Sequence, residues 1–492
     1  MERSELKHKT FQAVVWALVR IGSTNVLGFI VFAVMARVLS PHDFGLFALA
    51  ILVVDVARIV STAGLSDAIT RDPHNDEILA DTAFWANIGL ACVVGAVAWV
   101  LAPIYAWVIE QPEIVPVLHW LAVLVPISAL SGIHTARKLR EFGHKAIAVR
   151  TIVCGALGGG AAIAAAIAGF GVWSLVIQTA IVDVVGIVFA WQTYRWWPRL
   201  RFDTRRLRDV WGFSGTMMLT QVLGLLLTRI QDLVIGRFIS VAAVGSYRIA
   251  WRMIDLIAQT TIHPLVGVSF VTLTHLQNDP EQFRKAFLRM LGLGALLTFP
   301  AICGFGVLAD DIVALLFGPK WAASAAIARV LTLMAIPFCM NFFLFPALAA
   351  MGRSGTIARS SIVQTLATLA LSLLAAPYGV QWVAAAYVLR TYLTMPYHLT
   401  LFKRDTGIGI VSMMRAIMPP FLASQAMVVA LWLIAPFLRS VLGGGAVFVA
   451  VAVSFGCAVF AGCLLLFAER YVRSNVDALL PLWKGRRAHV VE

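Results

Sequence analysis

Long apolar stretches, separated by short segments that hold charges, Gly or Pro, follow one another along almost the whole chain. A helix needs about 20 apolar residues to cross the hydrocarbon core of a bilayer. The pattern therefore predicts an all-α polytopic membrane protein with fourteen transmembrane helices. Their predicted ranges are 11–36, 44–68, 82–108, 114–136, 146–168, 171–194, 213–236, 242–273, 290–309, 322–350, 356–376, 379–402, 413–438 and 444–468.

The composition agrees with lipid as the main solvent of the chain. Of its 492 residues, 60% are hydrophobic and 13% are charged, whereas about a quarter of the residues of a soluble domain are charged. This excludes a water-soluble protein, and also a soluble enzyme on a single anchor. The first apolar run, 11–36, has no small-residue cleavage site and is too long for a signal peptide, so we expect it to be retained as a helix.

The basic residues orient the predicted helices, because Lys and Arg accumulate in cytoplasmic loops. With fourteen helices, both termini lie on one side of the membrane. The loops on that side hold 28 Lys and Arg, whereas the other side holds Arg37, Arg237, Lys320 and Arg439. Both termini are therefore predicted to be cytoplasmic. Most of the formal charge of +14 results from this topology and does not indicate a nucleic-acid partner.

The sequence favours transport over catalysis. The predicted outer loops are short, so they leave no room for the catalytic acids that a membrane glycosyltransferase or sugar polymerase would carry there. Two glycine runs, 158–160 and 443–445, lie in apolar contexts, unlike a nucleotide-binding loop, and we expect no ATP hydrolysis, cofactor or metal. Six cysteines in apolar stretches are interpreted as packing residues; they are Cys92, Cys154, Cys303, Cys339, Cys457 and Cys463.

The two halves of the chain resemble each other at an offset of 200 residues. Arg37, Ser40, Gly45, Ala50 and Asp55 align with Arg237, Ser240, Gly245, Ala250 and Asp255, and 170–172 matches 378–380 at an offset of 208. We interpret this as a duplicated unit of six helices, which gives two parallel repeats. The predicted domains are an N-lobe (1–194), a basic cytoplasmic linker (195–212), a C-lobe (213–403), two further helices (404–470) and a cytoplasmic tail (471–492).

Four segments carry a resemblance to a known family. The loop 36–50, ARVLSPHDFGLFALA, is similar to the loop after the first helix of the polysaccharide transporter (Wzx-type flippase) family. The similarity continues through RKLREFGHKAIAVRTI (137–152), DLVIGRFISVAAVGSYRIAWRMID (232–255) and FGPKW (317–321). This family belongs to the multidrug/oligosaccharidyl-lipid/polysaccharide exporter superfamily. The resemblance implies two six-helix lobes around a cavity, alternating access, and export of undecaprenyl-diphosphate-linked sugar units.

Charges inside the predicted helices are mostly arginines. Seven arginines, Arg20, Arg58, Arg229, Arg248, Arg252, Arg329 and Arg390, stand against four acids, Asp55, Asp183, Asp232 and Asp255. Each such charge costs about 2.5–3.5 kcal/mol at the bilayer centre even by low estimates, so it should face water or a partner. The i to i+3 pairs Asp55–Arg58, Arg229–Asp232 and Arg252–Asp255 are spaced to neutralise each other. The arginines left over predict an anionic ligand, and a diphosphate suits forked guanidinium donors.

Two predicted helices carry polar stripes. Along 242–273, residues Arg248, Arg252, Asp255, Gln259 and His263 follow at steps of three or four and should share one face. Along 379–402, a similar stripe holds Tyr387, Arg390, Thr394 and His398, and the first helix holds Arg20, Ser23 and Thr24. We expect these stripes to line an aqueous cavity.

The stripes, the other charges inside the predicted helices and the aromatic residues close to the stripes supply the candidates for the site. Arg20, Arg58 and Arg252 are the first candidates for diphosphate binding, followed by Arg248 and Arg390, with Gln259 and Tyr387 in the same cavity. Tyr247, Trp251 and Tyr387 are candidates to stack on sugars. Arg329, near the outer interface, is expected to extend its side chain toward water. If transport is coupled to H+ or Na+, the candidates are Asp55, Asp183, Asp232 and Asp255.

The predicted protein is a flippase in a bacterial inner membrane. Its partners would be a polyprenyl-diphosphate-linked glycan, the lipid bilayer, and the machinery of polysaccharide polymerisation and export. Three alternatives stay open. A peptidoglycan lipid-precursor flippase would share the arginines and the helix count. A multidrug or cation antiporter should carry a cavity rich in carboxylates. A membrane sugar polymerase or glycosyltransferase is disfavoured by the short outer loops.

Overall fold

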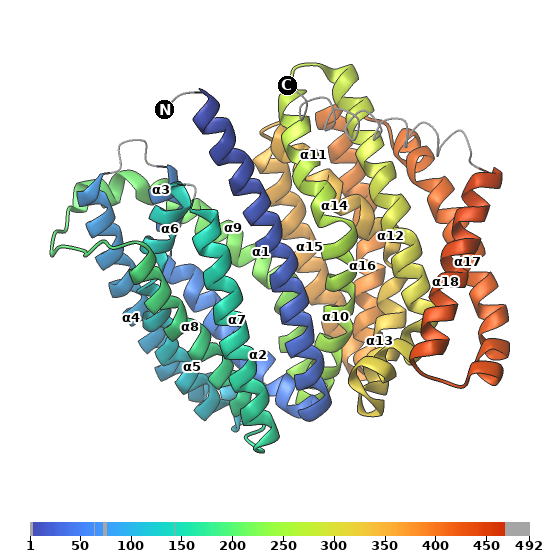
Figure 1. The fold of residues 1–492 in the computed structure, drawn as a ribbon, viewed down its shortest axis with the longest axis horizontal. Coiled ribbons are helices and arrows are strands. Elements are labelled where there is room, and N and C mark those ends of the chain that lie inside the picture. Colours follow the sequence, from blue (N-terminus) through green and yellow to red (C-terminus); the bar gives the residue numbers. More distant parts are fainter. Residues whose placement is uncertain (1–2, 63, 72–75, 142, 468–492) are drawn as a thin grey trace. The chain divides into compact units, whose positions relative to one another are not determined.

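A computed structural model describes residues 3–62, 64–71, 76–141 and 143–467 (Figure 1). Within these ranges the regular structure is helical, without a strand. The predicted tail 471–492 lies outside the described residues, as does the side chain of Arg20. Contacts between Cα atoms divide the chain into two compact units, Met1–Gly245 and Ser246–Glu492.

The first unit holds nine complete helices and the first turn of a tenth among the described residues. These are α1 (Arg3–Val38), α2 (Pro41–Thr62), α3 (Leu65–Arg71), α4 (Glu77–Ile109), α5 (Ile114–Ala129), α6 (Gly132–Arg140), α7 (His144–Ile167), α8 (Trp173–Thr193), α9 (Thr204–Phe238) and the start of α10 (Val241–Thr261). In this unit α7 packs on α1 and α8, and α2 packs on α4, α5 and α9.

The second unit holds the rest of α10 and the remaining helices. These are α11 (His263–His275), α12 (Pro280–Phe317), α13 (Ala322–Thr332), α14 (Ala335–Ala350), α15 (Ser354–Ala375), α16 (Val380–Thr406), α17 (Ile410–Leu442) and α18 (Ala446–Phe467), with short 3-10 turns at Pro319–Trp321 and Ala376–Tyr378. Here α12 packs on α17, α17 on α18, and α15 on α16. The aromatic side chains of Phe287, Phe299, Phe343 and Phe402 lie in its core.

The linker predicted at 195–212 is extended only in its first half. Asp203 caps α9, because its carboxylate accepts hydrogen bonds from the backbone N–H groups of Arg205 and Arg206. Helix α9 therefore begins at Thr204, and it packs on α2, α3 and α4 in the first unit. The compact units thus divide the chain after α9, whereas the lobes derived from the repeat divide it before α9. The boundary of the repeat stays a prediction.

Four of the predicted helices are broken in the structure, so each is corrected to a helix pair. Range 44–68 becomes α2 and α3, with Gly64 in the left-handed region at φ 70°. Range 114–136 becomes α5 and α6. Range 242–273 bends by 49° between α10 and α11, because Pro264 in the first turn of α11 has no N–H to continue the ladder. Range 322–350 bends by 65° between α13 and α14.

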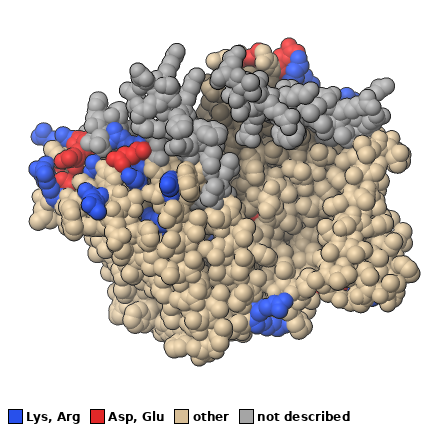
Figure 2. All heavy atoms as spheres, viewed as in Figure 1, with Lys and Arg blue, Asp and Glu red and all other residues tan. Residues whose placement is uncertain are grey.

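The helices are suited to a bilayer. Nine of the described helices, α5–α6 counted as one, are long and apolar enough to cross a membrane, and the two bent pairs bring the number to eleven. The other three predicted ranges fall on α1, α9 and α16, and the count of fourteen stays a prediction. On the face shown in Figure 2, the charged side chains of the first unit gather at the end that carries α3 and α6. The remainder of that unit's visible surface is almost uncharged.

Candidate functional site

The first unit holds an ion pair between Arg58 on α2 and Asp183 on α8. The Arg58 Nη2 atom lies 2.6 Å from Asp183 Oδ2, and both side chains are largely buried. The sequence-based pairing of Arg58 with Asp55 is therefore corrected: its carboxylate partner comes from a helix 125 residues away. The Nε atom of Arg58 is also buried, and it has no hydrogen-bond partner. The guanidinium thus keeps donor capacity beyond this ion pair.

A second guanidinium, that of Arg150 on α7, lies near the same carboxylate. Arg150 donates to the hydroxyls of Thr135 and, at 3.1 Å, Ser131 on the chain leading into α6. Gly186 on α8 makes room for it, because a Cβ atom there would lie 2.9 Å from Arg150 Nη2. Arg150 is absent from the set of deep arginines derived from the sequence. Its hydroxyl partners, spaced i to i+4 in the preceding helix, are the signal that could have found it.

A cavity of about 470 Å³ opens beside Arg150. Its lining comes from α1, α6, α7 and α8, and it includes the polar side chains of Thr24, Thr135, Thr151 and Gln178. Thr24 belongs to the polar patch predicted on the first helix. The first unit therefore brings two arginines, one carboxylate and a cavity lined by hydroxyls into one region, with two positive charges facing one negative charge.

The remaining candidates of the first unit are Arg229, Asp232, Asp55 and Arg20. Arg229 and Asp232 form the predicted i to i+3 pair, with Nη1 and Oδ2 3.8 Å apart and Asp232 fully buried. Asp55 is half-buried on α2 and has partners of its own. Arg20 lies on α1, where its side chain is outside the described residues.

In the second unit, Arg390 on α16 is a buried arginine surrounded by neutral groups. Its side chain is 1% exposed, its Nη1 atom donates to Gln364 Oε1 on α15 at 3.0 Å, and its Cζ atom lies 4.3 Å from the centre of the Tyr387 ring. Among the described residues no carboxylate pairs with it. A buried charge of this kind is expensive unless a ligand compensates it.

Gln364 connects Arg390 to His398. The Gln364 Nε2 atom lies 3.0 Å from His398 Nε2. Because a guanidinium can only donate, Arg390 fixes the amide oxygen of Gln364 toward itself and leaves the amide N–H to donate to the histidine. His398 Nε2 must then be an acceptor, which requires a neutral ring. The orientation of one amide therefore links the charge of Arg390 to the protonation state of His398.

Gln364 belongs to a buried polar stripe that the sequence analysis missed. Thr356, Ser360, Gln364, Thr368 and Ser372 follow at steps of four along α15, and all are buried. At the lower-numbered end of the stripe, Thr356 donates to Asp405 on α16. The signal was present in the sequence as a regular spacing of four, but it is composed of neutral residues and is weaker than a row of charges. The stripe faces the predicted polar residues of α16.

Helix α10 reaches Tyr387, the ring beside Arg390, through an aromatic contact of Trp251. The rings of Trp251 on α10 and Tyr387 on α16 meet edge to face, with centroids 5.1 Å apart. Trp251 Nε1 and Gln259 Oε1 are buried without a hydrogen-bond partner. Arg248 and Arg252 are half-buried on the same helix. The ring of Trp251, whose N–H has no partner, thus lies against Tyr387, which in turn covers the buried guanidinium of Arg390.

His263 does not continue the stripe of α10. The helix ends at Thr261, and His263 begins α11 beyond the 49° bend. Its ring instead contacts Phe342 on α14, with centroids 5.3 Å apart. The prediction that His263 shares a face with Arg248, Arg252 and Asp255 was wrong, because the spacing rule holds only within a continuous helix.

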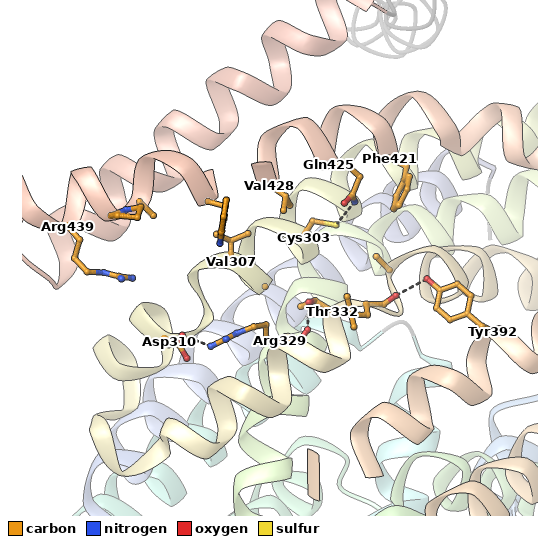
Figure 3. Close-up of a pocket in the computed structure, with 16 residues that line it drawn as sticks. Cys303, Val307, Asp310, Arg329, Thr332, Tyr392, Phe421, Gln425, Val428 and Arg439 are labelled. Atoms are coloured by element: carbon orange, nitrogen blue, oxygen red, sulfur yellow. Dashed lines mark hydrogen bonds and ion pairs between the residues drawn. The ribbon is translucent and has the colours of Figure 1, made fainter. Parts of the chain in front are cut away.

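A second cavity, of about 660 Å³, lies between α12, α13, α16 and α17 (Figure 3). Arg329, expected to extend toward water, pairs there with Asp310, and Arg439 pairs with Asp311 at 2.6 Å. The deeper lining includes Phe421 and Gln425, whose amide lies 3.7 Å from Cys303 Sγ. Both arginines are neutralised and half-exposed, so this cavity lacks the excess positive charge of the other two clusters.

A solved structure has the same fold as this chain. The structure of "Lipid II flippase MurJ, inward closed conformation" superposes with a TM-score of 0.76 at 12% identity, over 94% of this chain and all of the other. The chain therefore has the fold of a polytopic membrane transporter, which confirms the predicted all-α membrane architecture.

The comparison of sequences identifies the family. Residues 34–326 match the family described as polysaccharide biosynthesis protein, and the chain belongs to this family. It is 26% identical over 355 residues to the succinoglycan biosynthesis transport protein ExoT of Rhizobium meliloti (strain 1021), and this alignment covers 72% of each chain. It is 22% identical over 347 residues to the lipopolysaccharide biosynthesis protein WzxC of Escherichia coli (strain K12), covering 67% of this chain and 68% of the other. The resemblance based on the loop motifs is confirmed.

Proposed function

We propose that this protein moves polyprenyl-diphosphate-linked oligosaccharide units across the bacterial inner membrane by alternating access, for the biosynthesis of an extracellular polysaccharide. The observation that carries the proposal is the buried guanidinium of Arg390, which faces Gln364 and Tyr387 but no carboxylate among the described residues. A diphosphate headgroup would compensate this charge. Membership in a polysaccharide biosynthesis family supports a lipid-linked glycan as the substrate.

Each unit holds a candidate phosphate-binding cluster of its own. In the first unit, Arg58 is neutralised by Asp183 and Arg150 is held by hydroxyls. A diphosphate that enters displaces Asp183 from Arg58, because phosphate oxygens accept forked hydrogen bonds at least as well as a carboxylate. In the second unit, Arg390 receives phosphate while the rings of Tyr387 and Trp251 offer flat faces to a sugar. Arg20, Arg248 and Arg252, with Gln259, complete the proposed set.

Coupling to H+ or Na+ is part of the proposal. When phosphate takes Arg58, the largely buried carboxylate of Asp183 loses its partner. A buried carboxylate without a partner favours uptake of a proton or a cation. Displacement of Asp183 thus links substrate binding to ion binding. Asp55, Asp232 and Asp255 are the further candidates for this role.

The arrangement favours a flippase over the alternatives. An antiporter of cationic drugs needs carboxylates that await a cation, whereas Asp183 and Asp232 are engaged by arginines. Membership in a polysaccharide biosynthesis family favours a substrate of that pathway over the lipid precursor of peptidoglycan. The protein is proposed to act without catalysis of its own, with both termini in the cytoplasm, and to hand the flipped glycan to the polysaccharide polymerase and export machinery.

Deletion of the gene tests the proposal. We expect a lipid-linked oligosaccharide to accumulate on the cytoplasmic leaflet while extracellular polysaccharide is lost. Complementation with Arg329→Gln, at an ion pair that is half-exposed, should restore export, whereas Arg390→Gln at equal abundance should not. Unchanged glycans together with accumulation of a cationic dye would instead establish an antiporter.

A further inference from the structure

The segment between α8 and α9, residues 195–203, presents large apolar side chains to its surroundings. Trp197 is 76% exposed, Leu200 is 89% exposed and Phe202 is 55% exposed. We call this segment the strap. Three large apolar side chains within six residues form an exposed patch, and exposing such a patch to water is unfavourable. Patches of this kind mark contacts with a membrane or a partner.

Arginines alternate with these apolar side chains. Arg195, Arg199 and Arg201 are exposed along the strap, and Arg205 and Arg208 are exposed on the first turns of α9. Residues 195–209 contain six Arg and two Asp, and Asp203 is engaged in capping α9. The patch is therefore strongly basic as well as apolar.

The strap is anchored to the first unit through its backbone. The Arg199 N–H donates to Asp81 Oδ1 at 3.1 Å, and Trp85 Nε1 donates to the Arg199 carbonyl at 2.9 Å, both from α4. His134 on α6 bonds the Trp196 carbonyl at 3.0 Å. The Asp203 N–H donates to Thr82 at 3.0 Å. The backbone of the strap is therefore held against the first unit at Trp196, Arg199 and Asp203.

We propose that the strap lies in the cytoplasmic interface of the membrane and binds the headgroups of anionic phospholipids. Trp, Leu and Phe are the side chains that enter the boundary between headgroups and acyl chains, and guanidinium groups pair with lipid phosphates. Apolar side chains and arginines alternate over 197–202. This pattern suits the membrane interface, where acyl chains lie just below a layer of negatively charged phosphates. The inference uses the predicted cytoplasmic orientation and does not depend on the transported substrate.

The test measures the depth of a nitroxide spin label at position 200. The full chain, with its six cysteines replaced by alanine, carries Leu200→Cys and is reconstituted in phosphatidylcholine vesicles with or without phosphatidylglycerol. Oxygen concentrates in the bilayer, whereas a water-soluble nickel complex stays outside it, so the ratio of the label's contacts with the two reports its depth. We expect this ratio to rise several-fold when phosphatidylglycerol is present. Gln282→Cys, exposed at the start of α12, is the control and should stay in contact with water in both lipids.

Neutralising the charges separates the two parts of the proposal. The pair of changes Arg199→Gln and Arg201→Gln leaves the backbone anchors intact, and it should abolish the response to phosphatidylglycerol. A label at position 200 that contacts water in both lipids would overturn the proposal and leave the strap as a surface for a cytoplasmic protein. Equal burial in both lipids, or no effect of the two glutamines, would also overturn it, because anionic headgroups would then have no part.

Discussion

Gly45 in α2 and Gly245 in α10 pack against each other's helix in a reciprocal way, both within the first unit. A Cβ atom on Gly45 would lie 1.8 Å from the carbonyl oxygen of Val241, and one on Gly245 would lie 1.9 Å from that of Pro41. Positions 41 and 45 correspond to 241 and 245 at the offset of the sequence repeat. The two contacts are therefore equivalent under the offset of the repeat.

Alanine at either glycine should destabilise the protein. A methyl group cannot fit within 2 Å of a backbone oxygen, so the helix starts must separate, at a cost of roughly 1–3 kcal/mol. We expect Gly45→Ala and Gly245→Ala to lower the unfolding temperature of the detergent-purified protein by similar amounts. Gly89→Ala, at an exposed position in α4 with open space around it, is the matched control. Unfolding temperatures equal to that of the control would contradict the contact.

Transport should require both the positive charge of Arg390 and the forked donors of its guanidinium. Arg390→Gln removes the charge, and Arg390→Lys keeps it but loses the forked donors. A hydrogen bond to a charged group is worth about 1.5–3 kcal/mol, so we expect export to fall roughly 10- to 100-fold in the first variant. The second should be intermediate. Export of both variants at the wild-type level, at equal abundance, would remove Arg390 from the site.

Gln364→Glu should inactivate the protein without unfolding it. The substitution keeps the shape of the side chain and supplies Arg390 with the carboxylate it lacks. The new carboxylate would pair with Arg390 and accept a hydrogen bond from His398 Nε2 once the neutral ring carries its proton there, so the unfolding temperature should not fall. A diphosphate would then have to compete for the guanidinium. The measurement compares unfolding temperature with flipping rate for Gln364→Glu and Gln364→Leu. A fully active Gln364→Glu variant would show that Arg390 does not bind the substrate.

Asp183→Asn should separate flipping from its driving force. Arg58 would then keep its charge without a carboxylate to displace, while the site that takes up a proton or a cation would be lost. We expect flipping in proteoliposomes to continue down a substrate gradient and to lose its response to an imposed pH or Na+ gradient. A response equal to that of the wild type would assign coupling to another acid, and Asp232→Asn is the comparison to make.

The helices could be predicted from the sequence, because a bilayer imposes a simple length and polarity on each of them. Every predicted range falls on a helix or a helix pair. The breaks within 242–273 and 322–350 were harder to predict, because Pro within a membrane helix bends it in some contexts and is tolerated in others. The wrong placement of His263 on the polar face of α10 follows directly from the bend that was not predicted.

The site could be predicted only in part. Arg58 and Arg390 were found because charge in an apolar helix is conspicuous. The partner of Arg58 could not be found, since Asp183 lies 125 residues away and spacing rules extend over one or two turns. Arg150 was missed because it follows a basic loop, and Gln364 because it is neutral. Their importance comes from what lies opposite them in space.

The most direct test of the central claim is the initial rate at which the full chain, in proteoliposomes, moves a fluorescent polyprenyl-diphosphate oligosaccharide between leaflets. We predict rapid movement by the wild type and by Arg329→Gln, and a rate lower by roughly tenfold or more for Arg58→Gln and Arg390→Gln. Equal rates in all four proteins, or none above protein-free vesicles, would contradict the account.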